Sequence, residues 1–236
     1  MKKIIQLGGV VAFVCISMAE ETPQALRAER PGEWWMQRHD EKVAAAAQGG
    51  VDLIHIGDSI THYGEREALY DTYFGHRNTL NLGFGGDGTQ NVLWRLQNGE
   101  VDGLTPKLVV VMIGTNNAGR DDPADIVLGI QAIVTELRTR VPASEILLFS
   151  IFPRAAGAEH DCNVAVNAQL ASLADGVHVF HMDINSHFVN GDGSLKEELY
   201  YTDLLHLSSQ GYQLWWEQME PAVSQALGDD PVEPAE

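Results

Sequence analysis

The chain has 236 residues and a formal net charge of −18, from 15 Lys and Arg against 33 Asp and Glu, and 44% of it is hydrophobic. This length and apolar fraction exclude a disordered chain and indicate one large domain with a substantial core. The acidity excludes non-specific nucleic-acid binding and polybasic attachment to anionic lipid, because both need clustered Lys and Arg. We therefore expect a neutral or cationic partner, such as a small molecule or a glycan, and no nucleic acid.

The first 19 residues predict an export signal. Two lysines precede a mostly apolar run over residues 4–18, and Ser17 and Ala19 supply the small residues of a cleavage site after Ala19. The run is too short and too interrupted by glycine for stable insertion in a membrane. The mature protein is then secreted or periplasmic, and loss of both lysines takes its net charge to −20. Cleavage also removes Cys15, so the remaining Cys162 can form no intramolecular disulfide.

Short β-branched, apolar runs alternate with helix-length segments through the rest of the chain. Strands are predicted at residues 51–57, 79–82, 107–113, 145–151 and 177–182. Helices are predicted at residues 33–48, 66–73, 89–98, 123–140, 162–174 and 208–227. The last residues, 229–236, are acidic and contain proline, and they predict a disordered tail.

The clearest strand and the clearest helix define the fold class. The run 107–113 is continuously apolar, as expected for a strand buried on both faces. In the helix at 123–140, apolar residues recur at helical spacing, Pro123 takes the first position after Asp122, and Pro142 follows the end. Strands alternating with helices form a parallel sheet covered on both faces. The sequence therefore predicts an α/β domain over residues 20–228, with a parallel sheet of about five strands.

Four short segments lie where ligands bind in such a sheet, outside the carboxyl ends of the strands. The sequence reads GDSI at residues 57–60, NLGFGGD at 81–87 and GTNN at 114–117, after three successive strands. The fourth segment, DLLH at residues 203–206, precedes the last helix. Each tetrapeptide is common alone, but all four in this order predict a single site.

The four segments contain the residue types that acyl transfer needs. A serine hydroxyl needs a neighbouring base, and the base needs a carboxylate to orient it. Ser59, His206 and Asp203 fit these roles, since Asp203 and His206 are three residues apart and can lie on one turn. A tetrahedral intermediate also needs fixed hydrogen-bond donors. We expect these donors to be the N–H groups of Ser59 and Gly86 and the side-chain amide of Asn116.

Through these residues, the sequence resembles the SGNH hydrolases, also called GDSL esterases, over most of the mature chain. Residues 81–87, 92–96 and 98–100 especially resemble the catalytic subunits of intracellular platelet-activating factor acetylhydrolase. The resemblance implies a flavodoxin-like three-layer α/β/α sandwich and ester hydrolysis that needs no metal or other cofactor. It also implies a short acyl pocket, and the positions that match its lining are Ile60, Thr115 and Leu205.

The predicted export signal separates this chain from those intracellular subunits, so we do not expect their phospholipid substrate. The preferred hypothesis is a serine esterase that removes O-acetyl groups from carbohydrates through an acyl-enzyme intermediate. One alternative is a lysophospholipase or thioesterase acting on longer acyl chains. The other is a catalytically silent carbohydrate-binding protein on the same fold. The negative charge favours neutral glycans over acidic ones.

Other patterns give weaker indications. The run GFGGDG at residues 83–88 fits a dinucleotide-binding pattern, but it follows the second strand, and the next strand ends without an acid for the ribose. The histidines and cysteines lack zinc-site spacing, and NGDGS at 190–194 fits a turn better than a calcium loop. His62 is a candidate substrate contact. Roles for Tyr63, His187 and the tryptophan pairs at 34–35 and 215–216 stay open.

Overall fold

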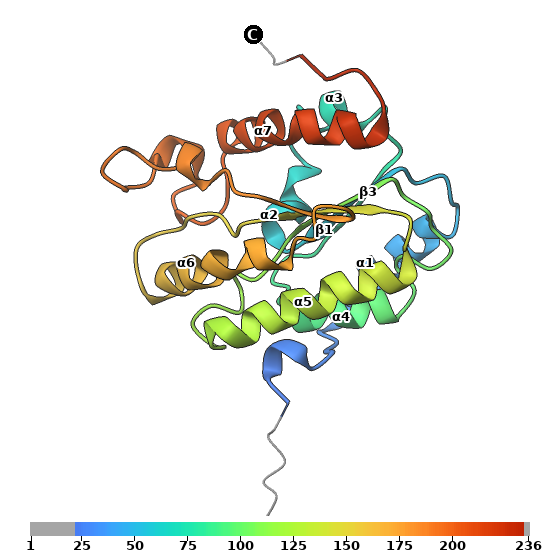
Figure 1. Ribbon diagram of the computed structural model, residues 1–236, viewed down its shortest axis with the longest axis horizontal. Helices are drawn as coiled ribbons and strands as arrows, with labels where there is room; N and C mark the ends of the chain where they lie inside the picture. The colour runs from blue at the N-terminus through green and yellow to red at the C-terminus, as the bar shows by residue number, and fades with distance from the viewer. Residues whose placement is uncertain (1–21, 234–236) are drawn as a thin grey trace, which may run out of the picture.

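The computed structural model describes residues 22–233, so the predicted export signal over residues 1–19 lies outside the described part of the chain. Five parallel strands form one sheet in the order β2-β1-β3-β4-β5. Their bounds are Leu53–Gly57 (β1), Thr79–Gly83 (β2), Leu108–Met112 (β3), Glu145–Phe149 (β4) and Val179–Met182 (β5). Figure 1 shows the sheet edge-on between two layers of helices, which confirms the predicted α/β/α sandwich.

The helices alternate with the strands along the chain. The α-helices are Glu33–Ala46 (α1), Ser59–Gly64 (α2), Tyr70–Phe74 (α3), Thr89–Gln97 (α4), Pro123–Arg140 (α5), Ala158–Leu170 (α6) and Ser209–Leu227 (α7). Short 3-10 turns occur at Gln24–Leu26 (η1), Ala171–Leu173 (η2), Asn185–His187 (η3) and Glu197–Leu199 (η4).

Two apolar cores lie on the two faces of the sheet, because successive side chains of a strand point to opposite faces. Ile54 and Ile56 of β1 belong to the core under α1, α4, α5 and α6, whereas Leu53 belongs to the core under α2, α3 and α7. In β3, Val109 and Val111 pack on the first face and Val110 on the second. Both faces are therefore buried, and all five residues of β1 and β3 are buried.

The helix at Pro123–Arg140 has the predicted bounds, whereas the region after β1 does not. The helix predicted at 66–73 is the shorter α3, and an unpredicted helix, α2, begins directly at Ser59. With six residues, α2 is too short to show a helical repeat of apolar residues. The α6 helix begins at Ala158, earlier than predicted, so Cys162 lies inside its second turn and is partly exposed.

The chain stays attached to the domain for several residues beyond α7, so the predicted tail begins too early. Arg77 is buried, and its guanidinium donates to both carboxylate oxygens of Glu220 at 2.7 and 2.6 Å and of Asp229 at 2.9 and 3.1 Å. The N–H of Val232 also donates to Glu220, at 2.8 Å. The buried cation needs these partners, and it holds residues 229–232 against the domain.

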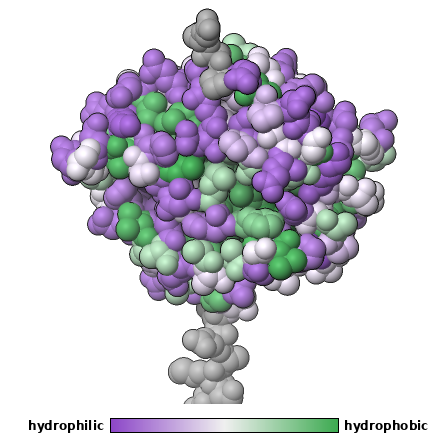
Figure 2. Space-filling view, turned by 45° about the horizontal axis from the view of Figure 1, so that its top comes forward, coloured by the Kyte–Doolittle hydropathy of each residue, from purple (hydrophilic) through white to green (hydrophobic). Residues whose placement is uncertain are grey.

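The face of the molecule in Figure 2 is mostly hydrophilic, with small apolar patches separated by polar residues. Among residues 22–233, no helix is both long and apolar enough to cross a bilayer. The same described residues contain no group of three or more His, Cys, Asp or Glu arranged to hold a metal ion.

Candidate active site

Ser59, His206 and Asp203 form a continuous hydrogen-bonded chain at the carboxyl edge of the sheet. The Ser59 Oγ lies 2.8 Å from Nε2 of His206, and Nδ1 of the same ring lies 2.6 Å from Oδ2 of Asp203. An ionised carboxylate can only accept, so Nδ1 carries the ring proton and Nε2 accepts from the serine hydroxyl. The three side chains thus have the order and polarity that a general base needs to activate a serine.

Ser59 owes its place to the sharp passage from β1 into α2. Asp58 is the N-cap of α2, and its Oδ1 accepts from the N–H of Ile60 at 2.9 Å. Gly57 must lack a side chain, because a Cβ there would lie 2.1 Å from Oγ1 of Thr61 and 2.5 Å from the carbonyl oxygen of Met112. The helix is thereby seated directly on the sheet, with Ser59 in its first turn.

Asp203 holds the turn over residues 203–206, which carries His206. Asp203 Oδ1 accepts from the N–H groups of Leu205 and His206, at 3.0 Å each, while Oδ2 faces the imidazole. Leu204 takes a left-handed conformation with φ of 51°, and this turn brings the ring back over the carboxylate. Partial burial opposes ionisation, but the hydrogen bonds from His206 and Leu205 outweigh it and lower the pKa of Asp203.

Gly86 and Asn116, the two other predicted oxyanion donors, are joined by Asp87. The Asn116 side-chain amide donates to the carbonyl oxygen of Asp87 at 2.9 Å, which leaves its second N–H free of that bond. Gly86 has φ of +83°, and nothing lies within 4 Å of a Cβ built on it. Glycine is therefore needed for the backbone conformation, and its backbone is open to an approaching molecule.

Three of the four predicted substrate contacts, Ile60, Thr115 and Leu205, are buried or partly buried in the domain. Ile60 is buried in the core beneath α7, and its carbonyl oxygen accepts from the Tyr212 hydroxyl at 2.7 Å. Thr115 is buried, and its Oγ1 accepts from Asn163 at 3.1 Å. Leu205 is partly buried.

His62 is buried and contacts the loop over residues 83–88 that follows β2. Its Nδ1 accepts from the N–H of Gly85 at 3.3 Å. Burial and the neighbouring Arg38 lower the pKa of His62 to about 4, so the ring is neutral near pH 7.

A buried charge network that the sequence does not predict lies behind the loop over residues 83–88. Arg95 is fully buried and forms ion pairs with Asp87, at 2.9 Å, and with Glu100. Trp35 Nε1 donates to the other oxygen of Asp87 at 2.6 Å, and His39 Nδ1 lies 3.0 Å from Glu100. Asp87 follows Gly86 directly, and its carbonyl oxygen accepts from Asn116 on the loop after β3, so the network fixes the loop that carries Gly86 and is joined to the loop that carries Asn116. The sequence offered two signals for this network: Asp87 lies two residues before the helix predicted at 89–98, and Arg95 lies among the apolar residues of that helix.

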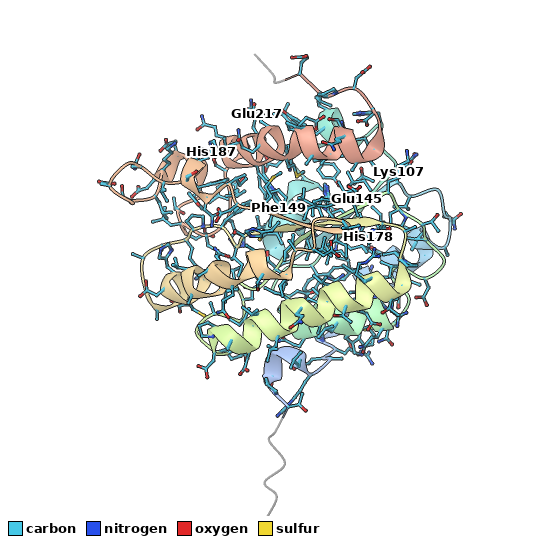
Figure 3. The ribbon with its side chains drawn as sticks, viewed as in Figure 1. Lys107, Glu145, Phe149, His178, His187 and Glu217 are labelled. Atoms are coloured by element: carbon cyan, nitrogen blue, oxygen red, sulfur yellow. The ribbon has the colours of Figure 1, made fainter. Side chains whose placement is uncertain are left out.

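The tryptophan pairs, Tyr63 and His187, whose roles the sequence left open, lie in different environments. Trp35, Trp215 and Trp216 are buried in the cores, whereas Trp34 is 54% exposed. Tyr63 packs on the imidazole of His206, with ring centroids 5.3 Å apart. Figure 3 shows His178 beside Lys107 and Glu145, at the amino ends of the strands, and His187 lies away from them across the molecule.

The carboxyl of Asp58 makes the stability of the domain depend on pH. Asp58 is fully buried, and its Oδ2 has no hydrogen-bond partner. Burial, with a smaller contribution from Asp87, raises the pKa of Asp58 to about 7, whereas an unfolded Asp titrates near 3.9. Between about pH 4 and 7 the folded protein keeps a proton that the unfolded chain has lost, so its free energy of unfolding falls as pH rises through this window.

Asp58→Asn is expected to remove this dependence, because the amide oxygen still caps α2 and does not titrate. Urea unfolding should show the variant more stable than wild type at pH 8, by up to about 4 kcal/mol, and equally stable near pH 4. Parallel stability profiles for the two proteins from pH 4 to 8 would contradict the assignment.

Comparison with known proteins identifies the family of the chain. A model of the GDSL-like Lipase/Acylhydrolase family matches residues 55–214. The platelet-activating factor acetylhydrolase IB subunit alpha2 of Rattus norvegicus is 32% identical over 214 residues, covering 89% of this chain and 93% of the relative.

Solved structures show the same fold at low identity. A GDSL-like lipase from Bacteroides thetaiotaomicron has a TM-score of 0.68 at 19% identity, covering 80% of this chain and 97% of its own. A carbohydrate esterase family 3 protein from Talaromyces cellulolyticus has a TM-score of 0.58 at 17% identity, covering 76% and 99%. By its family model and its relatives, the chain belongs to the GDSL-like lipase/acylhydrolase family and is an ester hydrolase.

Proposed function

We propose that the protein is a serine esterase that removes acetyl groups from carbohydrates, and that Ser59, His206 and Asp203 form its catalytic triad. The observation that carries the proposal is the unbroken hydrogen-bonded chain from Ser59 Oγ through His206 to Asp203. The Ser59 oxygen attacks the ester carbonyl while Nε2 takes its proton, and the imidazolium then protonates the leaving alcohol. Water, deprotonated by the same ring, cleaves the acyl-enzyme and releases acetate.

The oxyanion of each tetrahedral intermediate is bound by the N–H groups of Ser59 and Gly86 and the amide of Asn116. The open face of Gly86 and the bond from Asn116 to the neighbouring Asp87 support this assignment. Donors that are already fixed need no reorganisation as the charge develops, which is why they lower the barrier. The buried charge network around Asp87 and Arg95 holds Gly86 in place.

Two features favour a short acyl group on a carbohydrate. Ile60 and Thr115, at the positions of the expected acyl pocket, are both buried and held by contacts within the domain, which is consistent with a short acyl group. On the open side, Trp34 is exposed and lies 3.9 Å from a Cβ built on Gly85, next to the oxyanion donor Gly86. Tyr201 is half-exposed, and its N–H donates to the carbonyl oxygen of His206 at 2.8 Å. Exposed aromatic faces beside a site suit the C–H faces of sugar rings.

The proposal includes export, through the signal over residues 1–19, to the periplasm or the outside of the cell, where acetylated glycans occur as substrates. The net charge of −20 that we expect for the mature protein favours neutral glycans, because an acidic polymer is repelled.

Acetate release from acetylated xylan, chitin, pectin and sialic acid tests the substrate class, beside p-nitrophenyl esters from acetate to octanoate. We expect release from a neutral glycan and falling rates beyond butyrate. Undiminished rates on long chains would favour the lysophospholipase or thioesterase alternative. Trp34→Ala should raise KM for the glycan about 2- to 10-fold, the value of one aromatic contact, and leave p-nitrophenyl acetate unchanged. Val177→Ala, at another exposed apolar side chain, is the matched control.

A further inference from the structure

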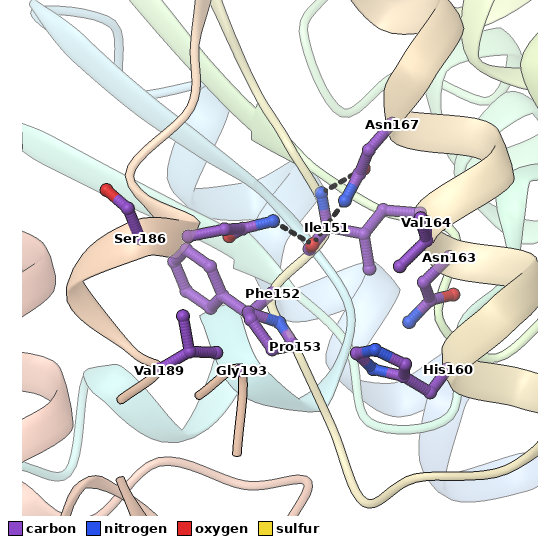
Figure 4. Close-up of a pocket in the computed structure, with 11 residues that line it drawn as sticks. Ile151, Phe152, Pro153, His160, Asn163, Val164, Asn167, Ser186, Val189 and Gly193 are labelled. Atoms are coloured by element: carbon purple, nitrogen blue, oxygen red, sulfur yellow. Dashed lines mark hydrogen bonds between the residues drawn. The ribbon is translucent and has the colours of Figure 1, made fainter. Parts of the chain in front are cut away.

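The backbone of the turn over residues 203–206 is anchored to the segment that follows β4. The N–H of Ala155 donates to the carbonyl oxygen of Leu204 at 2.8 Å. Figure 4 shows how α6 holds this segment in turn: dashed lines mark the bonds of 2.8 Å from the side chain of Asn167 to the N–H and the carbonyl oxygen of Ile151. These contacts fix the backbone of the turn, but none of them reaches the ring of its histidine.

The imidazole of His206 needs a restraint beyond its hydrogen bond to Asp203. The torsion that turns an imidazole about its bond to Cβ has broad minima, so rotamer preference alone does not set the direction of Nε2. The side chain of Asp203 is 48% exposed and that of His206 is 23% exposed. Water therefore competes for the bond between them, and a pair in such surroundings holds the ring weakly.

Tyr63 provides a second contact, on the ring itself. Its ring centroid lies 5.3 Å from that of His206, at an interplanar angle of 37°, within the range of packed aromatic pairs. Among residues 22–233, it is the one aromatic side chain whose ring packs on this imidazole. Ser59 and Tyr63 are four residues apart in α2 and so lie on one face of the helix. A single short helix thus holds both the oxygen that bonds to Nε2 and the ring that packs on the imidazole.

The Tyr63 ring is itself held in place. The guanidinium carbon of Arg66 lies 4.5 Å from the centroid of the ring, at the distance of a cation–π contact. The hydroxyl lies 3.6 Å from a Cβ built on Gly85, which is van der Waals distance from the loop after β2. The side chain is partly buried and packs against the core under α7. Because the ring is fixed by these contacts, turning Nε2 away from Ser59 would break its packing on the imidazole.

We propose that Tyr63 is a positioning residue, whose ring keeps Nε2 of His206 directed at Ser59 through both steps of ester hydrolysis. The role rests on the proposed triad. In acylation Nε2 takes the proton of the Ser59 hydroxyl and passes it to the leaving alcohol, and in deacylation it takes a proton from water and returns it to Ser59. A misdirected imidazole slows both steps, since small displacements of reacting groups lower rates by up to about 100-fold.

Hydrolysis of p-nitrophenyl acetate by variants at Tyr63 tests this role. Tyr63→Leu and Tyr63→Met both remove the ring and should lower kcat about 10- to 100-fold. KM should stay near the wild-type value, because acylation and deacylation slow together. Tyr63→Phe keeps the ring and should keep kcat near that of wild type. Phe180→Leu, the matched control, removes another partly buried ring, in β5, and should also leave kcat unchanged.

The proton on Nδ1 of His206, which Asp203 accepts, gives a second measurement, one that a general loss of stability does not change. Its downfield ¹H NMR signal should be sharp in wild type and in Tyr63→Phe, where the ring has one orientation. In Tyr63→Leu the signal should broaden, because the imidazole turns and exchanges its proton with water. Melting temperatures show that the variants compared are folded.

Wild-type kcat in a folded variant without the ring would overturn the positioning role. So would an equal loss of kcat in Tyr63→Phe or in Phe180→Leu. Ser59→Ala tests the triad separately, so the two failures are distinguishable. An active Ser59→Ala protein would remove the triad, whereas an inactive one beside a fully active Tyr63→Leu protein would remove only the role of Tyr63.

Discussion

Ser59→Ala is expected to lower kcat for p-nitrophenyl acetate by roughly 10⁴- to 10⁶-fold, because the attacking oxygen is lost and only binding and oxyanion stabilisation persist. Asp203→Asn should cost less, roughly 10²- to 10⁴-fold, since the Asp203 carboxylate is half-exposed and water can partly replace it. Both variants should fold, as neither side chain belongs to a core. Initial rates with purified protein, compared with melting temperatures, check both expectations.

Equal rates for wild type and Ser59→Ala would remove Ser59 from catalysis. They would also return the catalytically silent carbohydrate-binding alternative to first place. An Asp203→Asn enzyme as inactive as Ser59→Ala would instead show that the carboxylate does more than orient the imidazole.

Arg95→Met is expected to destabilise the protein by about 3–5 kcal/mol, because it leaves the buried carboxylates of Asp87 and Glu100 without their cation. Burial raises the pKa of Asp87 to about 6 even beside Arg95. The Arg95→Met variant should therefore lose most stability above that pH, where the buried carboxyl of Asp87 is charged and has no cation beside it. At roughly 2–4 °C per kcal/mol for a domain of this size, the melting temperature at pH 8 should fall by about 6–20 °C.

Arg140→Met is the matched control, since Arg140 pairs with Glu136 and Asp102 at the surface and should cost no more than about 1 kcal/mol. Combining Arg95→Met with Asp87→Asn and Glu100→Gln should recover part of the loss. If the Arg95→Met protein were as stable as the control, the carboxyls of Asp87 and Glu100 would not need Arg95 as their cation, and the expectation would be wrong.

The strands and long helices were predictable because their apolar patterns repeat. The continuous run in β3 and the spaced apolar residues between Pro123 and Arg140 each fit only one kind of element, and the structure has both. Ligands bind outside the carboxyl ends of parallel strands, and this principle predicted that Ser59 and His206 belong to one site. The two residues are 147 positions apart in sequence, and Oγ of Ser59 lies 2.8 Å from Nε2 of His206 in the structure.

The contacts that support the site could not be predicted from sequence, because they depend on distances between elements. His62 is predicted from the sequence as a substrate contact, and its hydrogen bond to the backbone N–H of Gly85 is seen only in the structure. Nothing local to Arg95 shows that it meets Glu100 and the loop at Asp87 in one buried cluster.

The buried guanidinium of Arg77 also constrains the order in which the domain can be completed. Its partners Glu220 and Asp229 follow it by 143 and 152 residues, so Arg77 cannot be buried with its ion-pair partners until residues 220 and 229 have been synthesised. Contacts between residues so distant in sequence form late, because they need the whole intervening chain to close into a loop. The edge of the sheet at β2 therefore becomes fully stable only when the last helix has docked.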